Sequence, residues 1–204
     1  MKGEQKSMLT NKHIVLLGGD ARQIEIIRKL SGLDAQLTLV GFDQLNDGFI
    51  GATKETIDQV NWEKADAIIL PVSGMSVDGH IDTIFSNESI QFDESFLRET
   101  PQHCVVYTGI SNEQLDKLVE NFDRTLVKLM ERDDVAIYNS IPTAEGTVMM
   151  AIQHTDITIH SAKVAVLGLG RIGMTLARTF AALGANVKVG ANDPAQIARI
   201  TEMV

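Results

Sequence analysis

The sequence predicts an α/β fold in which parallel strands are covered by helices on both faces. Short apolar runs of β-type residues alternate with helical stretches along most of the chain, which is typical of a parallel sheet. The runs at 68–70 and 164–167 are apolar on successive residues, as expected for strands buried on both sides. A glycine-rich turn near residue 168, between a strand and a helix, is the third indication.

Six strands and several helices are expected along the chain. The strands lie at 13–18, 36–42, 66–72, 103–109, 163–167 and 186–189. Two helices of the first half have apolar faces at helical spacing, formed by Ile24, Ile27 and Leu30 in one and by Leu115, Leu118, Val119 and Phe122 in the other. We expect Ser111 to cap the second of these helices, with Gln114 as its reciprocal partner.

The pattern divides the chain into two domains joined by a helix. A first α/β domain is placed at 9–142, a connecting helix and linker at 143–160, and the opening of a second α/β domain at 161–204. We expect the connecting helix to begin at Thr143, a good capping residue, and to end at His154. Glu145 would then lie in the positively polarised first turn. Glu145 and His154 are candidate acid or base residues, although charge complementarity with the helix ends explains both without catalysis.

Composition and charge indicate an ordinary globular protein that is neither secreted nor bound to membranes. The 204 residues are 44% hydrophobic and 22% charged, and the formal net charge is −9, which is unfavourable for binding nucleic acids or anionic membranes. No apolar run is long enough to span a membrane, and no signal-peptide pattern is present. The lone cysteine, Cys104, is expected to be buried and inert, and a cytoplasmic location follows. No metal site is predicted, because the histidines and the cysteine lack ligand spacing.

The motif GLGRIG at 168–173 directly follows a predicted strand and opens a predicted helix. Gly168 permits the tight turn, Gly170 lets a pyrophosphate approach the backbone, and Gly173 lets the helix pack closely on the strand. The helix N-terminus then presents free N–H groups and a positive dipole to the phosphates. This context predicts an NAD(P)-binding Rossmann unit, whereas a glycine turn alone could lack any ligand. Arg171 either contacts phosphate or points to solvent.

The residues after the second strand of this unit bear on the choice between NAD and NADP. An acidic residue at the strand end would bind the ribose 2′-hydroxyl of NAD, whereas small residues leave room for the 2′-phosphate of NADP. The sequence reads VGAND at 189–193, in which Asn192 can donate a hydrogen bond and Asp193 comes late for the NAD role. The pattern favours NADP and leaves NAD open. The residues expected at the cofactor are Gly168, Gly170, Arg171, Ile172, Gly173 and Asn192.

The loops that follow the strands of the first domain are candidate substrate-binding segments, because ligands of open parallel sheets lie beyond the carboxyl ends of the strands. The candidates on these loops are Arg22, Ser73, Thr108, Ser111 and Asn139. A guanidinium binds a carboxylate in a bidentate fork, so Arg22 is the candidate for holding an acidic substrate. Arg22 could equally be a surface residue of a first helical turn, and the hydroxyls could equally serve as helix caps.

Four strings of the sequence resemble one family. They are GGDARQ at 18–23, LVGFDQL at 39–45, ERDDVAIYNSIPTAEG at 131–146 and VLGLGRIG at 166–173. In these strings the chain resembles the A subunit of dipicolinate synthase from spore-forming bacteria, from about residue 9 to its end. Apart from the glycine motif, which many dinucleotide-binding proteins share, the strings are specific to this family.

The resemblance implies a flavodoxin-like or Rossmann-like N-terminal domain, followed by the first βαβ part of an NAD(P)-binding Rossmann domain. It also implies an NAD(P)-dependent oxidation of dihydrodipicolinate, a small dicarboxylate, to dipicolinate in the mother-cell cytoplasm during sporulation. The implied partner is the B subunit of dipicolinate synthase, and a homo-oligomer is compatible with the family. Members of the family continue beyond the end of this chain, so we expect the cofactor domain to be incomplete and the 204-residue chain alone to be inactive.

Two other functions remain open from the sequence. A non-catalytic module could dock a partner protein or serve assembly without using a cofactor. A 2-hydroxyacid dehydrogenase-like oxidoreductase would share the plan in which a helix joins the substrate and cofactor domains. Binding of NADPH separates the first alternative from an enzyme, and turnover of lactate-like acids identifies the second.

Overall fold

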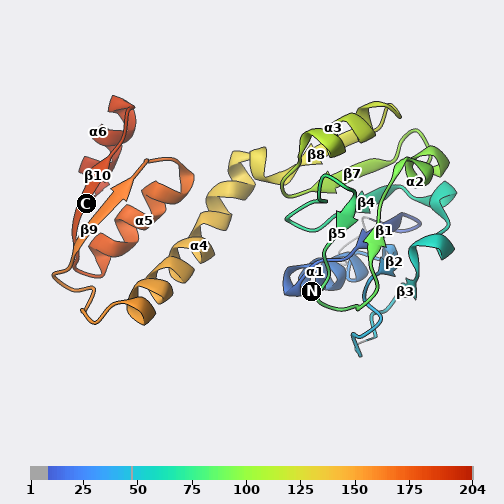
Figure 1. Cartoon of the computed structure of the whole chain (residues 1–204), viewed down its shortest axis with the longest axis horizontal. Helices are drawn as coiled ribbons and strands as arrows, with labels where there is room; N and C mark the ends of the chain where they lie inside the picture. The colour runs from blue at the N-terminus through green and yellow to red at the C-terminus, as the bar shows by residue number, and fades with distance from the viewer. Residues whose placement is uncertain (1–8, 47, 204) are drawn as a thin grey trace, which may run out of the picture. The chain divides into compact units, whose positions relative to one another are not determined.

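The computed structural model describes residues 9–46 and 48–203. The chain divides into two compact units, Met1–Leu129 and Met130–Val204, which are coloured from blue to yellow-green and from yellow to red in Figure 1. The division falls earlier than the expected end of the first domain at 142. No helix among the described residues is long and apolar enough to cross a membrane.

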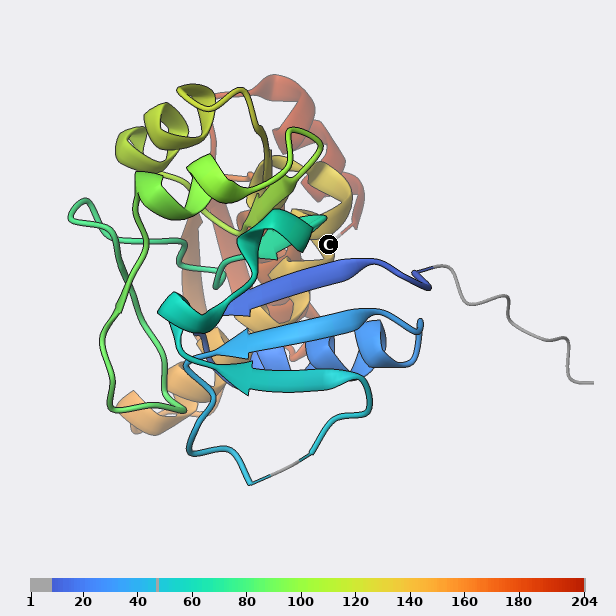
Figure 2. The same ribbon diagram turned by 90° about the vertical axis from the view of Figure 1, so that its right-hand side faces the viewer.

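The first unit is built on a six-stranded sheet in which all strands are parallel. Its strands are β1 (His13–Leu17), β2 (Gln36–Val40), β3 (Ala52–Glu55), β4 (Ala67–Ile69), β7 (Val105–Thr108) and β8 (Thr125–Lys128). The order across the sheet is β3-β2-β1-β4-β7-β8, and β1, β2 and β3 run side by side in Figure 2. This is the Rossmann order. The chain begins in the middle of the sheet with β1, adds β2 and β3 on one side, and then continues with β4 on the other side.

Helices cover both faces of this sheet, as the apolar runs predict. On one face, Ile27 of α1 (Ala21–Ser31) packs with Ile14, Leu16 and Leu37. The other face is covered by the short turns η1 (Ile57–Gln59) and η2 (Trp62–Lys64) and by the helices α2 (Glu94–Glu99) and α3 (Glu113–Glu120). The turn η3 (Leu129–Glu131) spans the division between the units, and a two-stranded antiparallel sheet is formed by β5 (His80–Ile81) and β6 (Ile90–Gln91).

The predicted cap of α3 is wrong by one residue. Asn112, not Ser111, is the N-cap, and its Oδ1 accepts a hydrogen bond from the Leu115 amide at 2.9 Å. Asn112 lies directly before the first helical residue, and Asn is as good a cap as Ser. The hydroxyl of Ser111 is therefore available for another contact.

The second unit contains the predicted strand, glycine turn, helix and second strand. Its elements are α4 (Asp133–His154), β9 (Lys163–Leu167), α5 (Arg171–Ala182), β10 (Asn186–Gly190) and α6 (Pro194–Met203). The strands β9 and β10 are parallel, so α5 is the crossover of a βαβ unit. A small core of Val166, Leu169, Ala177 and Ile200 holds the unit together.

The connecting helix begins ten residues earlier than expected, and Thr143 is not its cap. The helix α4 starts at Asp133 and contains Pro142 in its interior. The Thr143 hydroxyl donates to the Asn139 carbonyl at 2.9 Å, one turn back in the same helix. Glu145 therefore lies in the middle of α4 and not in its first turn, whose acidic residues are Asp133 and Asp134. Proline lacks the N–H for one bond of the helical ladder, and α4 nevertheless continues through Pro142 to His154.

Candidate functional site

The strand order of the first unit reverses between β1 and β4, which is where ligands of open parallel sheets bind. The glycines Gly18 and Gly19 follow β1, and the segment 71–74 follows β4. We refer to this carboxyl edge between β1 and β4 as the switch point. Its geometry depends on two places where backbone packs directly on backbone.

The turn after β1 is covered by the segment 82–84. The Gly19 amide donates to the Asp82 carbonyl at 2.8 Å, and the Ile84 amide donates to the Gly19 carbonyl at 3.0 Å. A Cβ on Gly18 would lie 2.6 Å from the Asp82 carbonyl oxygen, and both glycines have positive φ. In a dinucleotide-binding Rossmann unit this turn faces the pyrophosphate. Here the segment 82–84 fills the space beside the turn.

The turn after β4 packs in the same way on the loop after β7. The Ile110 amide donates to the Val72 carbonyl at 2.8 Å. A Cβ on Gly109 would lie 2.4 Å from the Val72 oxygen, and a Cβ on Gly74 would lie 2.4 Å from the Ile110 oxygen. Any larger residue would push these two loops apart, so Ser73 and Ile110 are held close to each other at the switch point.

Arg22 lies in the first turn of α1 and forms a forked ion pair with Asp20. Its Nε lies 2.9 Å from Asp20 Oδ1 and its Nη2 lies 2.5 Å from Oδ2. Asp20 is also the N-cap of α1, because Oδ1 accepts from the Arg22 amide at 3.0 Å. The hydrogen bonds from Arg22 hold the pKa of Asp20 below its usual range, and Asp20 raises the pKa of Arg22. An incoming carboxylate must therefore compete with Asp20 for the guanidinium.

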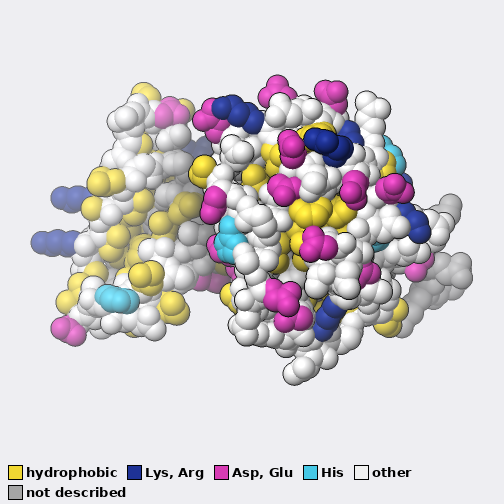
Figure 3. Space-filling model, turned by 45° about the vertical axis from the view of Figure 1, so that its right-hand side comes forward, with side chains coloured by type: hydrophobic (Ala, Val, Ile, Leu, Met, Phe, Trp, Pro, Cys, Tyr) yellow, Lys and Arg dark blue, Asp and Glu magenta, His cyan; other side chains and the backbone are white. Residues whose placement is uncertain are grey.

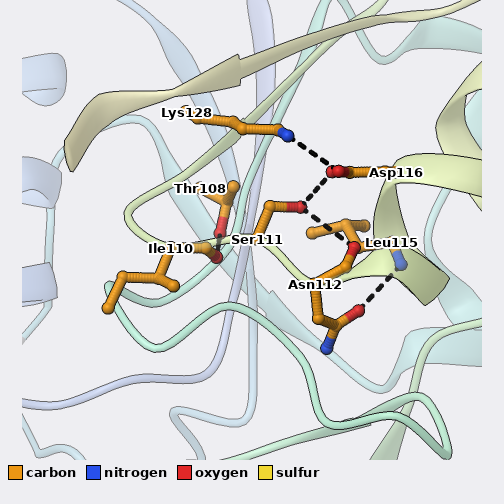
Figure 4. Close-up of polar contacts among 7 residues, drawn as sticks. All are labelled: Thr108, Ile110, Ser111, Asn112, Leu115, Asp116 and Lys128. Carbon is orange, nitrogen blue, oxygen red and sulfur yellow. Dashed lines mark hydrogen bonds and ion pairs between the residues drawn. The ribbon is translucent and has the colours of Figure 1, made fainter. Parts of the chain in front are cut away.

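Thr108 and Ser111 take part in a polar network at the ends of β7 and β8 (Figure 4). The buried Thr108 hydroxyl donates to the Ile110 carbonyl at 2.7 Å, so it shapes the loop. The Ser111 hydroxyl lies 2.5 Å from Asp116 Oδ1, and Lys128 Nζ lies 2.7 Å from Asp116 Oδ2. The bonds from Lys128 and Ser111 lower the pKa of Asp116. With its proton directed at Asp116, Ser111 can still accept a hydrogen bond from a ligand.

Four of the five candidate substrate-binding residues lie at the carboxyl edge of one sheet, and the fifth does not. Arg22, Ser73 and Ser111 follow strands of the first unit, and Thr108 is the last residue of β7. Ser73 is exposed. Asn139, which the sequence places on a loop of the same edge, is a residue of α4 in the second unit. The prediction of a loop is wrong because Pro142, a residue that commonly ends a helix, lies inside α4.

The two candidate acid or base residues also lie on α4. Glu145 is exposed, and no hydrogen bond or ion pair of its side chain is among those of the described residues. His154 is the last residue of the helix, as predicted, and its Nδ1 donates to the Met150 carbonyl at 2.9 Å. That bond satisfies one of the last carbonyls of the helix, a structural role that leaves Nε2 for other partners.

The glycine turn of the second unit differs from that of the first in having open space beside it. Gly168 has a φ of +88°, and a Cβ on Gly173 would lie 1.9 Å from the Gly168 oxygen. A Cβ on Gly170 would meet no heavy atom within 4 Å. The Nη1 of Arg171 contacts the Met130 carbonyl in η3 at 3.1 Å and Asp133 Oδ1 in the first turn of α4 at 3.3 Å. The first and third glycines are thus required by the fold, whereas the second leaves room for a ligand.

The end of β10 presents small or uncharged residues. Asn192 is exposed after Gly190 and Ala191. The Asp193 carboxylate accepts from the Ala195 amide at 2.9 Å, directly before α6, whose first residue is Pro194. Asp193 therefore caps α6, which is a structural reason for an acid at this position.

Elsewhere in the described residues we find no second candidate for a substrate, metal or nucleophile site. A cleft of about 370 Å³ at the ends of β2 and β3 is lined by Asp43, Glu55, Asp58 and Glu88, with Lys54 as its single basic residue. Its acidic lining is unsuited to a dicarboxylate. Among the described residues no group of three or more His, Cys, Asp or Glu side chains could hold a metal ion. Burial raises the pKa of Cys104 to about 11, so this thiol is a poor nucleophile.

Sequence reasoning missed Asp20 and Ile84 at the switch point. Asp20 could have been found, because an aspartate between a glycine turn and a helix is a typical N-cap. Ile84 carries no local signal, since its contact with Gly19 joins residues far apart in the chain. Figure 3 shows acidic side chains spread over the visible face of the first unit, with basic side chains among them.

A Rossmann-ordered sheet followed by a helix and a glycine-turn βαβ unit defines an α/β protein of the Rossmann-like class. The family of N-terminal domains of the dipicolinate synthase A subunit matches residues 13–130. The dipicolinate synthase A subunit of Bacillus subtilis (strain 168) is 60% identical over 196 residues, which are 96% of this chain and 66% of that protein. The chain belongs to the family of dipicolinate synthase A subunits, and the predicted resemblance is confirmed.

Solved structures agree with this assignment. The dipicolinate synthase A subunit from Bacillus halodurans has a TM-score of 0.92 at 67% identity, covering 96% of this chain and 67% of that one. The A chain of dipicolinate synthase from Bacillus subtilis has a TM-score of 0.89 at 60% identity, covering 97% and 66%. A transhydrogenase from Sinorhizobium meliloti, with a TM-score of 0.56 at 16% identity and coverage of 93% and 62%, shares the fold alone. This chain spans about two thirds of the length of its dipicolinate synthase relatives.

The close packing of loops at the switch point is tested by Gly109→Ala, with Gly32→Ala as control. The added methyl at Gly109 would clash with Val72, and we expect a loss of about 2–3 kcal/mol in the free energy of unfolding. Gly32 has a φ of −67° and its nearest neighbour would lie at 3.4 Å, so its variant should change stability by less than about 0.5 kcal/mol. The measurement is denaturant unfolding followed by fluorescence of Trp62, the single tryptophan, which is buried in the first unit. Equal midpoints for the two variants would refute this packing.

Proposed function

We propose that the chain is the substrate-binding and opening cofactor-binding part of an NAD(P)-dependent oxidoreductase that converts dihydrodipicolinate to dipicolinate. The observation that carries this proposal is the glycine turn 168–173, in which the backbone of Gly170 has open space beside it. The family assignment names the product, because the relatives are dipicolinate synthases. The activity, its substrate and its partners belong to relatives that are longer than this chain.

The residues of the turn fit a dinucleotide. The amides at the start of α5 and the positive end of its dipole would bind the pyrophosphate beside Gly170. Ile172 is 45% exposed in the first turn of α5 and could contact the cofactor. When bound, the nicotinamide supplies the hydride-accepting chemistry of the oxidation. Arg171 already contacts α4, which supports a role in fixing the turn over a role in binding phosphate.

NADP is the nucleotide that the end of β10 supports. Gly190 and Ala191 leave space for a 2′-phosphate, and the exposed Asn192 can donate to it. Asp193, the single acid nearby, is engaged as the cap of α6. A carboxylate held in a cap is not directed to the ribose 2′-hydroxyl, so the usual NAD contact has no candidate in this segment.

The substrate would bind through its carboxylates at the switch point. Arg22 would exchange its forked pair with Asp20 for one with a substrate carboxylate. The exposed Ser73 could donate to a second oxygen, and Ser111 could accept from a protonated group. The oxidation also releases a proton and so needs a base. Glu145 and His154 of the second unit stay candidate acid or base residues, without a position relative to the switch point.

The relatives are subunits of a synthase, which implies assembly with another polypeptide. We propose that this partner is the B subunit of dipicolinate synthase and that both act in the mother-cell cytoplasm during sporulation. A docking role without catalysis is the second candidate. It is favoured by the exposed apolar side chains of α4, which are Ile137, Tyr138, Ile141, Met149, Met150 and Ile152.

Cofactor binding is tested by Gly170→Ala. This variant should fold normally, because Gly170 has a φ of −69° and its added methyl meets nothing within 4 Å. The methyl would occupy the approach of the pyrophosphate, so we expect affinity for NADPH to fall at least about tenfold, which corresponds to the loss of about 1.4 kcal/mol of binding free energy. The measurement is calorimetric titration, with the far-UV circular dichroism of both proteins as the folding control. NADPH affinity equal to that of the unaltered chain would remove the turn from the proposed site.

The role of Arg22 is tested by Asp20→Asn. Asparagine keeps the cap of α1 but removes the charge that occupies the guanidinium. We expect affinity for pyridine-2,6-dicarboxylate to rise, by up to about fivefold, which is the scale of an exposed ion pair. The matched variant Arg22→Gln should lose binding. If Asp20→Asn and Arg22→Gln both bind as the unaltered chain does, Arg22 is a surface residue and the substrate site lies elsewhere.

A further inference from the structure

Two exposed isoleucines lie at the switch point, and their apolar side chains have been given no role so far. Ile84 is 66% exposed and Ile110 is 57% exposed. A single exposed apolar side chain is ordinary in a soluble protein. These two differ because the backbone of each is bonded to one of the two neighbouring strand ends, Ile84 to Gly19 after β1 and Ile110 to Val72 after β4.

The backbone at Ile84 is held rigidly by its neighbours. The Thr83 hydroxyl donates to the Gly41 carbonyl at 2.7 Å, and the Gln44 amide donates to the Phe85 carbonyl at 2.9 Å. The ring of Phe85 stacks on Phe42 with centroids 5.6 Å apart. The residues on both sides of Ile84 are thus bonded to the segment 41–44 that follows β2, while the Ile84 side chain is exposed to solvent.

The backbone at Ile110 is equally well held. Its amide donates to the Val72 carbonyl, and its carbonyl accepts from the buried Thr108 hydroxyl. Gly74 and Gly109 let the two loops pack backbone on backbone. An apolar side chain that is exposed on a rigid support loses little entropy when a ligand covers it. Both isoleucines therefore have the properties of ready-made contact points for an apolar group.

We propose that Ile84 and Ile110 contact the ring of a planar cyclic dicarboxylate while the polar residues beside them hold its carboxylates. This inference rests on the proposed function. Arg22 follows Gly19 by three residues, Ser73 follows Val72, and Ser111 follows Ile110, so each apolar contact has a polar neighbour at the same strand end. Small-molecule sites combine apolar surface with a few placed polar groups in this way. Two side chains are too little surface for a protein partner.

The test separates the ring from the charges of the ligand. The double variant Ile84→Thr plus Ile110→Thr keeps β-branched residues at exposed positions, and Val77→Thr is the control at a 75% exposed position in a different turn. Each protein is titrated with pyridine-2,6-dicarboxylate and with glutarate, a flexible dicarboxylate without a ring. We expect the double variant to bind pyridine-2,6-dicarboxylate about tenfold more weakly, because apolar contact area is lost. Binding of glutarate by the double variant, and of both ligands by Val77→Thr, should not change.

The possible results distinguish the role of the isoleucines from the proposed function. If the unaltered chain binds pyridine-2,6-dicarboxylate and Arg22→Gln abolishes it, the substrate site stands. If the double variant then binds pyridine-2,6-dicarboxylate with unchanged affinity, the role of the isoleucines is overturned while the substrate site stands. An equal loss for both ligands would mean that the variants disturb the carboxylate contacts, which also overturns it. If the unaltered chain binds neither ligand, the substrate site and the role of the isoleucines fail together.

Discussion

At the carboxyl ends of the strands, backbone packs directly on backbone. Glycine is needed at these contacts because it has no Cβ. A Cβ would lie 2.6 Å from the Asp82 oxygen at Gly18, 2.4 Å from the Val72 oxygen at Gly109 and 1.9 Å from the Gly168 oxygen at Gly173. Side chains cannot be inserted at such distances without moving the main chain. The positions of the residues at the switch point follow from this constraint, because Arg22, Ser73, Ile84 and Ile110 are each within four residues of one of these contacts.

Both units contain a strand, a glycine turn and a helix, but the space beside the turn is filled in one unit and open in the other. In the first unit the turn after β1 is closed by the chain's own segment 82–84, so side chains around it must provide any ligand contacts. In the second unit the turn after β9 stays open at Gly170, and backbone amides can face a ligand directly. This difference supports a division of labour in which the first unit binds a carboxylate substrate and the second binds a dinucleotide.

Much of the fold could be predicted from the sequence, because buried strands and a helix with an apolar face leave strong patterns. The strands β3 and β8 could not, since ATKE and TLVK at the two edges of the sheet are short and mixed in polarity. The predicted start of α4 is wrong because proline usually marks a helix boundary, whereas α4 continues through Pro142. The sequence indicates Arg22 but not its pairing with Asp20. The position of Ile84 could not be predicted, because it depends on a bond to Gly19, which lies far back along the chain.

The most direct test of two separate ligand sites is to map amide chemical shifts of the ¹⁵N-labelled chain during separate titrations with pyridine-2,6-dicarboxylate and with NADPH. We predict that the dicarboxylate shifts the amides at 19–23, 72–74, 84 and 109–111, whereas NADPH shifts those at 168–173 and 190–193. Two separate sets of shifts would establish that the two glycine turns serve two ligands. Shifts from the dicarboxylate in the acidic cleft lined by Asp43 and Glu88, or from NADPH around Gly18 and Gly19, would contradict it.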